Sequence, residues 1–168
     1  MKRLAALAAL CNAACQPPWT VRPIEENRPF QAAAYVDSIW DARVLPAASG
    51  AIEIAKWDRR APALVKGAGR ILGRDSDGRL LVDLPPYDGR ADLAIATGAA
   101  IHGTALRDAL PFIQFSQFVN QVDFARVASA LDDRAAKLAV PQSPEISFAG
   151  AAAIPPEGGL PELVPVTL

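Results

Sequence analysis

Five polar residues flank a Phe-rich segment and form the densest set of side chains able to make specific polar contacts: Thr104, Arg107, Asp108, Asn120 and Gln121. A guanidinium, a carboxylate and two amides that line one cleft could hydrogen-bond a polyol or a sugar, with an aromatic ring beneath it. The same groups could instead satisfy the backbone of an irregular segment and tie it to the rest of the fold. Both interpretations are compatible with the sequence.

Trp40 is a further candidate for ligand binding, because Asp41 follows it directly. An aromatic ring beside a carboxylate is a common arrangement in sugar-binding clefts. The alternative is that Trp40 packs in the core while the carboxylate of Asp41 stays in water.

The sequence contains no arrangement typical of a catalytic, metal or cofactor site. His102 is the single His and has no second ligand near it in the sequence, so it is expected at a strand edge. Gly67 and Gly69 lack the third Gly and the helix of a phosphate-binding loop. Two segments with carboxylates, Asp75–Gly78 and Pro86–Gly89, lack the spacing of a calcium loop and are expected to be turns. No G-x-S-x-G frame surrounds a Ser. We therefore expect a non-enzymatic protein without metal or cofactor.

The N-terminus has the pattern of a secretory signal. Lys2 and Arg3 precede a short apolar run over Leu4–Leu10, which is too short to span a bilayer as a helix. Cys11 and Cys15 follow, and no other Cys occurs in the chain. A disulfide framework in the body of the protein is therefore excluded, and a modified thiol near the cleavage point is the more informative interpretation.

The segment Ala13–Cys15 resembles the end of a bacterial lipoprotein signal, in which the Cys becomes the lipidated first residue. In that pattern a Leu usually stands where Asn12 stands here. An acylated Cys15 would anchor the protein firmly, because several acyl chains together give stable membrane residence. Gln16, which follows, leaves the choice between inner and outer membrane open. The alternatives are ordinary cleavage near Ala14 with a soluble periplasmic product, and an Ala-rich cytosolic helix.

Composition limits the class of partner. The net charge is −1 and no basic tract is present, so nucleic acid is not an expected partner. Hydrophobic residues make up 51% of the chain, which suffices for a globular core. The sequence is expected to divide into four parts. They are a signal with its lipid site (residues 1–15), a Pro-rich tether (16–29), a helical extension (30–58) and one folded domain (59–168).

Two helical patterns are visible. Within the extension an apolar stripe predicts a helix, and Pro46 predicts a break near Leu45 with a second helix over Ala47–Lys56. The spacing of apolar residues over Asp123–Ala139 predicts a long helix with Asp123 as its N-cap. Its apolar face, which must pack on another element and most simply on a sheet, contains Phe124, Val127, Leu131, Ala135 and Leu138.

Short alternating segments bounded by Gly and Pro predict strands. A continuation or further strand is expected over Ala99–Leu106. The predicted elements follow the order of three strands, one helix and two strands. This is the order of the OB-fold, a five-stranded Greek-key barrel with a helix between its third and fourth strands. We therefore predict a mainly β, α+β protein with an OB-like barrel, and an open α+β sheet is the alternative. The expected strands are Ala63–Gly73, Arg79–Leu84, Ala91–Thr97, Glu145–Ile154 and Leu163–Leu168.

Three segments resemble one known family. They are AAYVDSIWDARVLPA (33–47), LVKGAGRI (64–71) and GTALRDALPFIQFSQFVNQVDFARVASALDDRA (103–135). They are similar to a family of predicted bacterial periplasmic lipoproteins, a domain of unknown function whose members tend to be encoded beside sugar ABC transporters. The resemblance implies a lipid-anchored accessory role in the periplasm, with a component of a sugar ABC transporter as a possible partner. A purely structural or protein-interaction module without a small-molecule ligand is the alternative.

Overall fold

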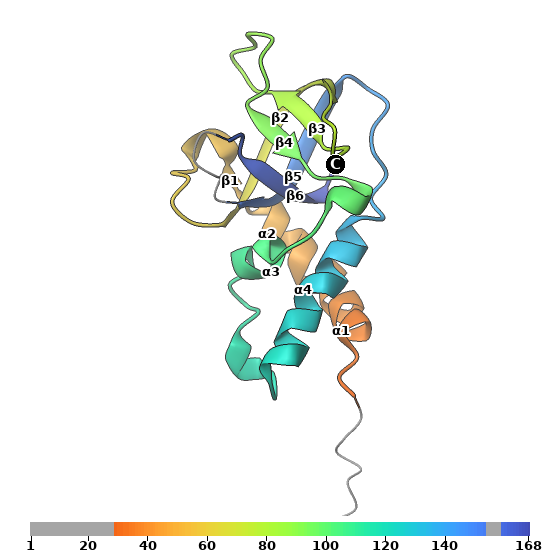
Figure 1. Ribbon diagram of the computed structural model, residues 1–168. Helices are drawn as coiled ribbons and strands as arrows, with labels where there is room; N and C mark the ends of the chain where they lie inside the picture. The colour runs from red at the N-terminus through yellow and green to blue at the C-terminus, as the bar shows by residue number, and fades with distance from the viewer. Residues whose placement is uncertain (1–28, 154–158) are drawn as a thin grey trace, which may run out of the picture.

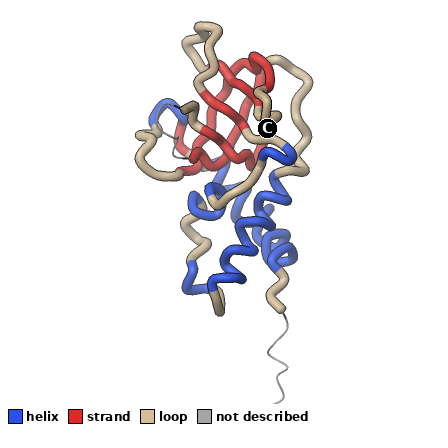
Figure 2. The backbone as a smooth tube through the Cα atoms, in the orientation of Figure 1, coloured by secondary structure: helices blue, strands red, loops and turns tan. Residues whose placement is uncertain are grey.

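The described residues form two layers, a β-barrel and a layer of helices beneath it (Figures 1 and 2). The computed structural model describes residues 29–153 and 159–168, so the predictions for residues 1–28 lie outside it. The described chain begins at the end of the molecule opposite the barrel (Figure 1). Within this described part, no helix has the length and apolar character needed to cross a membrane.

The barrel has the strand order β2-β3-β4-β6-β5, and β2 pairs again with β5 to close it. Strands β4 and β6 run parallel, whereas the other barrel pairs are antiparallel. The helix α4 lies between β4 and β5 in the chain, which confirms the predicted OB-like barrel and makes the open-sheet alternative wrong. The strands are β2 (Ala63–Arg74), β3 (Leu80–Asp83), β4 (Leu93–Ile95), β5 (Glu145–Ala153) and β6 (Glu162–Thr167).

Strand β2 belongs to both sides of the barrel. Residues 63–70 pair with β5, and residues 70–74 pair with β3. The register with β3 shifts between Ile71 and Gly73, which is where a long strand must bend to curl around a barrel. A Cβ on Gly69 would lie 2.5 Å from Cγ1 of Val82, so only Gly permits this close approach of β3.

The first helices form one continuous segment. It consists of α1 (Ala32–Ile39), a π-helical turn (Trp40–Val44) and α2 (Leu45–Ser49). The Leu45 N–H donates to the carbonyl of Trp40, five residues earlier, so the chain passes through a wide turn without leaving the helix. Pro46 then lies in the first turn of α2, where its missing N–H is tolerated. The predicted break near Leu45 is therefore wrong.

The second predicted helix, over Ala47–Lys56, ends early. Gly50 is its C-cap, and the chain continues as β1 (Ile52–Glu53) and a 3₁₀ turn, η2 (Ile54–Lys56). Strand β1 pairs in parallel with Val65 and Lys66 of β2, before β2 begins to pair with β3. The free edge of β2 captures this segment because its unpaired backbone groups need partners.

The strand predicted over Ala99–Leu106 is wrong. The chain forms a 3₁₀ turn, η3 (Gly98–Ala100), and a short helix, α3 (Ala105–Ala109). Gly98 has φ +54° and Gly103 has φ +111°, and these left-handed conformations turn the backbone out of the sheet. His102 therefore lies in the connection between η3 and α3, and its predicted place at a strand edge is also wrong.

The long helix α4 (Gln121–Ala135) follows a 3₁₀ turn, η4 (Phe115–Gln117). Its predicted apolar face is confirmed, since Val127, Leu131 and Ala135 are buried. The helix begins two residues earlier than predicted and ends four residues earlier. It packs mainly on α1, and it also contacts α3 and β6, so its partner is a helical layer as well as the sheet.

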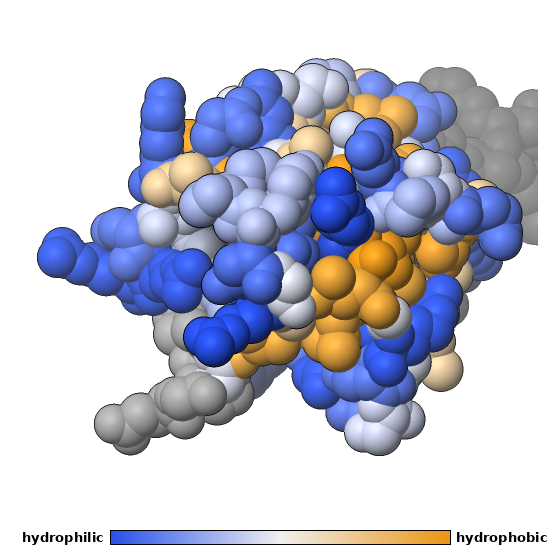
Figure 3. Space-filling model, turned by 90° about the horizontal axis from the view of Figure 1, so that it is seen from above, coloured by the Kyte–Doolittle hydropathy of each residue, from blue (hydrophilic) through white to orange (hydrophobic). Residues whose placement is uncertain are grey.

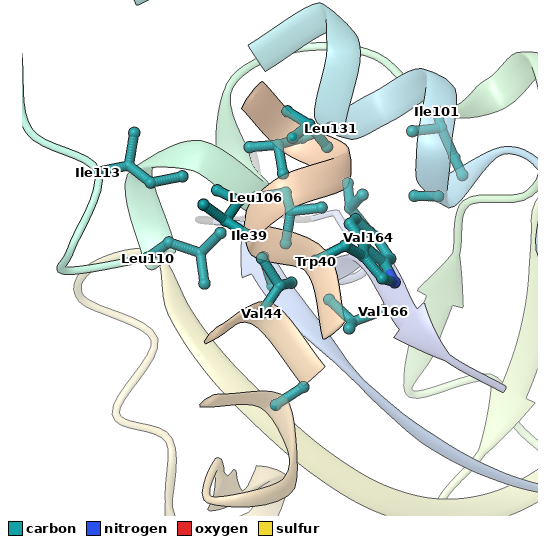
Figure 4. Close-up of a cluster of buried hydrophobic side chains, with 14 of the residues drawn as sticks. Ile39, Trp40, Val44, Ile101, Leu106, Leu110, Ile113, Leu131, Val164 and Val166 are labelled. Carbon is teal, nitrogen blue, oxygen red and sulfur yellow. The ribbon is translucent and has the colours of Figure 1, made fainter. Parts of the chain in front are cut away.

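Two hydrophobic clusters stabilise the two layers. One fills the barrel and includes Val82, Ile95 and Phe148. The other lies between the barrel and the helices, where side chains from α1, α3, α4 and β6 converge (Figure 4). The barrel end, seen from above, is covered mostly by hydrophilic side chains, with hydrophobic side chains gathered beside its centre (Figure 3). The helices thus share a core with the barrel.

Candidate interaction site

Three of the predicted polar residues form one closed hydrogen-bonded cluster at α3. The Thr104 hydroxyl donates to Oδ2 of Asp108 over 2.6 Å. Nε and Nη2 of Arg107 donate to Oδ1 of the same carboxylate over 2.9 and 2.7 Å. Both carboxylate oxygens of Asp108 are thus occupied, one by the N-cap residue of α3 and the other by a neighbour in the helix, and charge-assisted bonds of this length are strong.

Arg107 joins α3 to α4. Its guanidinium lies over the ring of Phe124, 4.0 Å from the centroid, and only 12% of its side chain is exposed. A guanidinium held between a carboxylate and an aromatic face is well satisfied electrostatically. Its contacts match the scaffold interpretation, in which Arg107 fixes one helix on the next.

Asn120 caps the N-terminus of α4. Its Oδ1 accepts from the Asp123 N–H over 2.9 Å, and its Nδ2 donates to the Asp123 carboxylate over 3.0 Å. Asp123 therefore lies inside the first turn, and its predicted role as the N-cap is wrong. Gln121, the first residue of the helix, is exposed. The five polar residues thus divide into the Thr104–Arg107–Asp108 cluster, a capping amide and one exposed amide.

Trp40 is a core residue. It is 4% exposed and packs between the helices and β6, close to Val164 and Val166 (Figure 4). The guanidinium of Arg134 lies 5.6 Å from the centre of its ring. The structure therefore places Trp40 where the core interpretation expected it.

Aromatic rings surround the start of α4. Phe118 lies within 5.6 Å, centroid to centroid, of Phe30, Tyr35 and Phe124. Phe115 makes an edge contact with Phe124 over 5.6 Å. Such pairs add to simple burial and fix the connection between η4 and α4 onto the beginning of α1.

Three exposed apolar side chains, from η4, from this connection and from the first turn of α4, are called the apolar tip. They are Phe115, Val119 and Val122, which are 54%, 96% and 57% exposed. Sequence reasoning placed the Phe residues beneath a ligand and did not identify an exposed surface. A usable signal was present, because no charged residue occurs between Asp108 and Asp123.

A second polar cluster lies on the barrel. Arg79 forms ion pairs with Asp75, Asp77 and Glu162 over 2.7, 3.0 and 3.0 Å. Burial tends to raise the pKa of Asp75, but hydrogen bonds from the Arg79 side chain and backbone outweigh burial and hold that pKa below its usual value. Asp75, Arg79 and Glu162 line a shallow hollow that none of the predicted site residues reaches.

Asp132 is the buried acid of α4. It is 8% exposed, and this burial raises the pKa of its carboxyl to about 6. The charge of His102 lowers that pKa and the neighbouring Asp133 raises it, both by less than burial does. Within residues 29–153 and 159–168, no group of three or more His, Cys, Asp or Glu residues is placed to hold a metal ion.

The closed barrel, with a helix between its third and fourth strands, defines the fold as an OB-fold. The chain belongs to the family described as predicted periplasmic lipoprotein (DUF2291), whose model matches residues 56–168. This membership confirms the predicted class and the predicted periplasmic, lipid-anchored location. Cys15, as the lipidated residue, stays a prediction because it lies outside the described part of the chain.

A solved structure supports the fold. The chain is similar to the crystal structure of an OB-fold protein from Thermotoga maritima, with a TM-score of 0.62 and 14% sequence identity. The match covers 83% of this chain and 98% of that one. At this identity the likeness concerns the fold alone. No curated protein is similar to the chain in sequence.

Proposed function

We propose that this chain is a non-enzymatic accessory protein that is held at a membrane by lipid on Cys15 and acts by contacting another protein. The partner implied by the family resemblance is a component of a carbohydrate ABC transporter. Exposed residues around α3 and the start of α4, including Thr104, Asp108 and Gln121, form the contact surface.

The closed Thr104–Arg107–Asp108 cluster is the observation that carries this proposal. A small polar ligand needs free donors and acceptors that converge on a concave site. Here the carboxylate of Asp108 is already bonded on both oxygens, and the amide of Asn120 caps a helix. A preformed surface whose polar groups already bond one another, with one exposed amide at Gln121, suits a protein partner better.

Site-specific photo-crosslinking in the envelope of the source cell tests the partner. A photoreactive amino acid at Gln121 is expected to crosslink a subunit of a carbohydrate ABC transporter, whereas the same probe at Ser76 on the barrel gives none. Absence of a transporter subunit among the Gln121 products would refute this partner and leave a purely structural module.

Thermal shift separates a protein contact from a sugar ligand. A sugar present at about 100 times its Kd would stabilise the protein by about 2.7 kcal/mol. We expect no shift across a broad sugar panel, because the candidate polar groups bond one another. A saturable shift that disappears in Arg107→Ala but not in Arg126→Ala would instead support a ligand site at α3.

Metabolic labelling with a palmitate analogue tests the anchor. The wild-type chain and Cys11→Ala are expected to carry label, and Cys15→Ala is expected to lose it. Label that survives Cys15→Ala would contradict the assignment of the lipidated residue.

A further inference from the structure

We propose that the apolar tip, formed by Phe115, Val119 and Val122, rests on the lipid bilayer that holds the anchor. This inference goes beyond the proposed protein contact and rests only on the lipid anchor. It assigns an orientation to the molecule, with the helical layer facing the lipid and the barrel facing the periplasm.

The composition of the tip suits the interfacial region of a bilayer. Val119 is 96% exposed, although it is a β-branched aliphatic residue with no polar atom in its side chain. The segment from residue 109 to 122 has no charged side chain, and its polar residues are uncharged amides and Ser116. Charged groups are costly to bring into lipid, whereas aromatic and aliphatic side chains insert favourably.

The start of the described chain lies at the same end of the molecule as the tip (Figure 1). Phe30 packs on Phe118, with the ring centroids 5.5 Å apart, so the chain enters the fold beside the tip. Only 14 residue steps separate Cys15 from Pro29. Even when fully extended, this length spans at most about 50 Å, so a lipidated Cys15 keeps this end of the molecule within about 50 Å of the bilayer.

Part of the backbone around the tip is paired by local hydrogen bonds. The Gln114 N–H donates to Oε1 of Gln117 over 2.9 Å, and the Gln117 N–H donates to the Gln114 carbonyl over 3.0 Å. Asn120 accepts from the first turn of α4. Because each unpaired backbone group costs free energy on leaving water, these local bonds make contact with lipid easier.

Lipid is the occupant that the anchor favours. An acylated Cys15 keeps this end of the protein at a high effective concentration relative to the bilayer surface, whereas a second copy or a transporter subunit must be recruited from the surroundings. Residues 16–28, a second copy of the chain and a transporter subunit are the other occupants, and the experiment below distinguishes them from lipid.

Fluorescence quenching by lipid tests the proposal on the mature lipoprotein in vesicles of phosphatidylethanolamine and phosphatidylglycerol. Removal of the leader takes Cys11 away and acylation blocks Cys15, so an introduced Cys is the one free thiol. An environment-sensitive probe is attached to the introduced Cys of the Val119→Cys variant. The matched control carries the same probe on Ser76→Cys, at an exposed turn of the barrel. Vesicles with brominated acyl chains are expected to quench and blue-shift the Val119 probe and to leave the Ser76 probe unchanged.

Removing the apolar side chains sharpens the test. Phe115→Ser with Val122→Ser is expected to abolish most of the quenching at position 119. Leu72→Ser, which removes an exposed apolar side chain of the barrel, is expected to leave that quenching intact.

Three results would overturn the proposal. They are no quenching at position 119, equal quenching at positions 119 and 76, and a probe at position 119 that is already shielded from water without vesicles. The last result would assign the tip to residues 16–28 or to a second copy. A probe that responds only when a transporter is added would assign the tip to protein, and the transporter crosslink would then stand without the lipid contact.

Discussion

The barrel and the helical layer are held together by different kinds of contact. In the barrel, backbones approach closely at Gly69 and Gly150, and aliphatic side chains together with Phe148 and Trp57 fill the interior. In the helical layer, an aromatic cluster and Arg107 join helices to one another, and apolar side chains remain exposed at the tip. The barrel thus supports the helical layer, and both contacts proposed above, with protein and with lipid, fall on the helical layer.

The largest expected effect concerns Trp40, where the two layers meet. Trp40→Ala should lower the free energy of unfolding by about 3–5 kcal/mol, because it empties a buried site between the helices and β6. Chemical denaturation measures the change, and Trp40→Phe should cost clearly less. A loss below about 1 kcal/mol would show that Trp40 does not join the layers.

Gly150→Ala tests the close approach inside the barrel. A Cβ at this position would overlap the carbonyl oxygen of Val164 and lie 2.8 Å from Cα of Pro165. The resulting backbone shift should cost about 3 kcal/mol in thermal or urea unfolding. At Gly73 an added Cβ meets nothing within 4 Å, so Gly73→Ala should change stability by less than about 0.5 kcal/mol. Equal effects at the two positions would contradict this account of the barrel.

Asp132 should make the helical layer sensitive to pH. Its pKa is about 6 in the folded protein, against 3.8 for the ordinary carboxyl, so the folded state binds the proton more tightly. The free energy of unfolding should therefore fall as the pH rises from about 4 to about 6, and Asp132 should contribute no further fall above about 7.

Asp132→Asn should remove this fall and raise stability at pH 7 by about 2 kcal/mol, with little gain near pH 4. Asp133→Asn, at an exposed neighbour, is the control and should have a much smaller effect. Unfolding curves measured across pH check both variants. An Asp132→Asn protein that is less stable than wild type at pH 7 would contradict the burial argument.

The smallest expected effect concerns the cap of α4. Asn120→Ala removes the acceptor for the Asp123 N–H and should cost about 1 kcal/mol. Gln121→Ala, at an exposed position with no cap role, should change stability by less than about 0.5 kcal/mol. Equal losses in the two variants would show that Asn120 does not act as a cap.

The barrel could be predicted from the sequence because its strands carry local signals. Alternating apolar residues and turns at Gly78 and Gly89, both with positive φ, define β2 to β4 within one or two residues. The helical layer was harder, because its boundaries depend on tertiary contacts. Ile52 pairs with Val65 at a free strand edge, and a π-helical turn lets the helix continue past Pro46. Neither feature has a local sequence signal.

The candidate site was predictable only as a set of residues. Thr104, Arg107 and Asp108 do come together, but their sequence spacing does not show that they bond one another. Nor does the sequence show that Phe124 would receive the Arg107 guanidinium. Whether polar groups face a ligand or each other depends on side-chain geometry.

Hydrogen–deuterium exchange tests most directly whether the helical layer is the contact region. Exchange is measured for the lipoprotein in bilayer vesicles and for the same protein in detergent-free nanodiscs that also contain its transporter. Residues 109–122 are expected to be protected at the bilayer, and α3 with the start of α4 is expected to gain further protection when the transporter is present. Exchange in β2, β3 and the turn at Ser76 should stay unchanged in both cases. Protection that appears on the barrel and spares residues 104–122 would contradict the account.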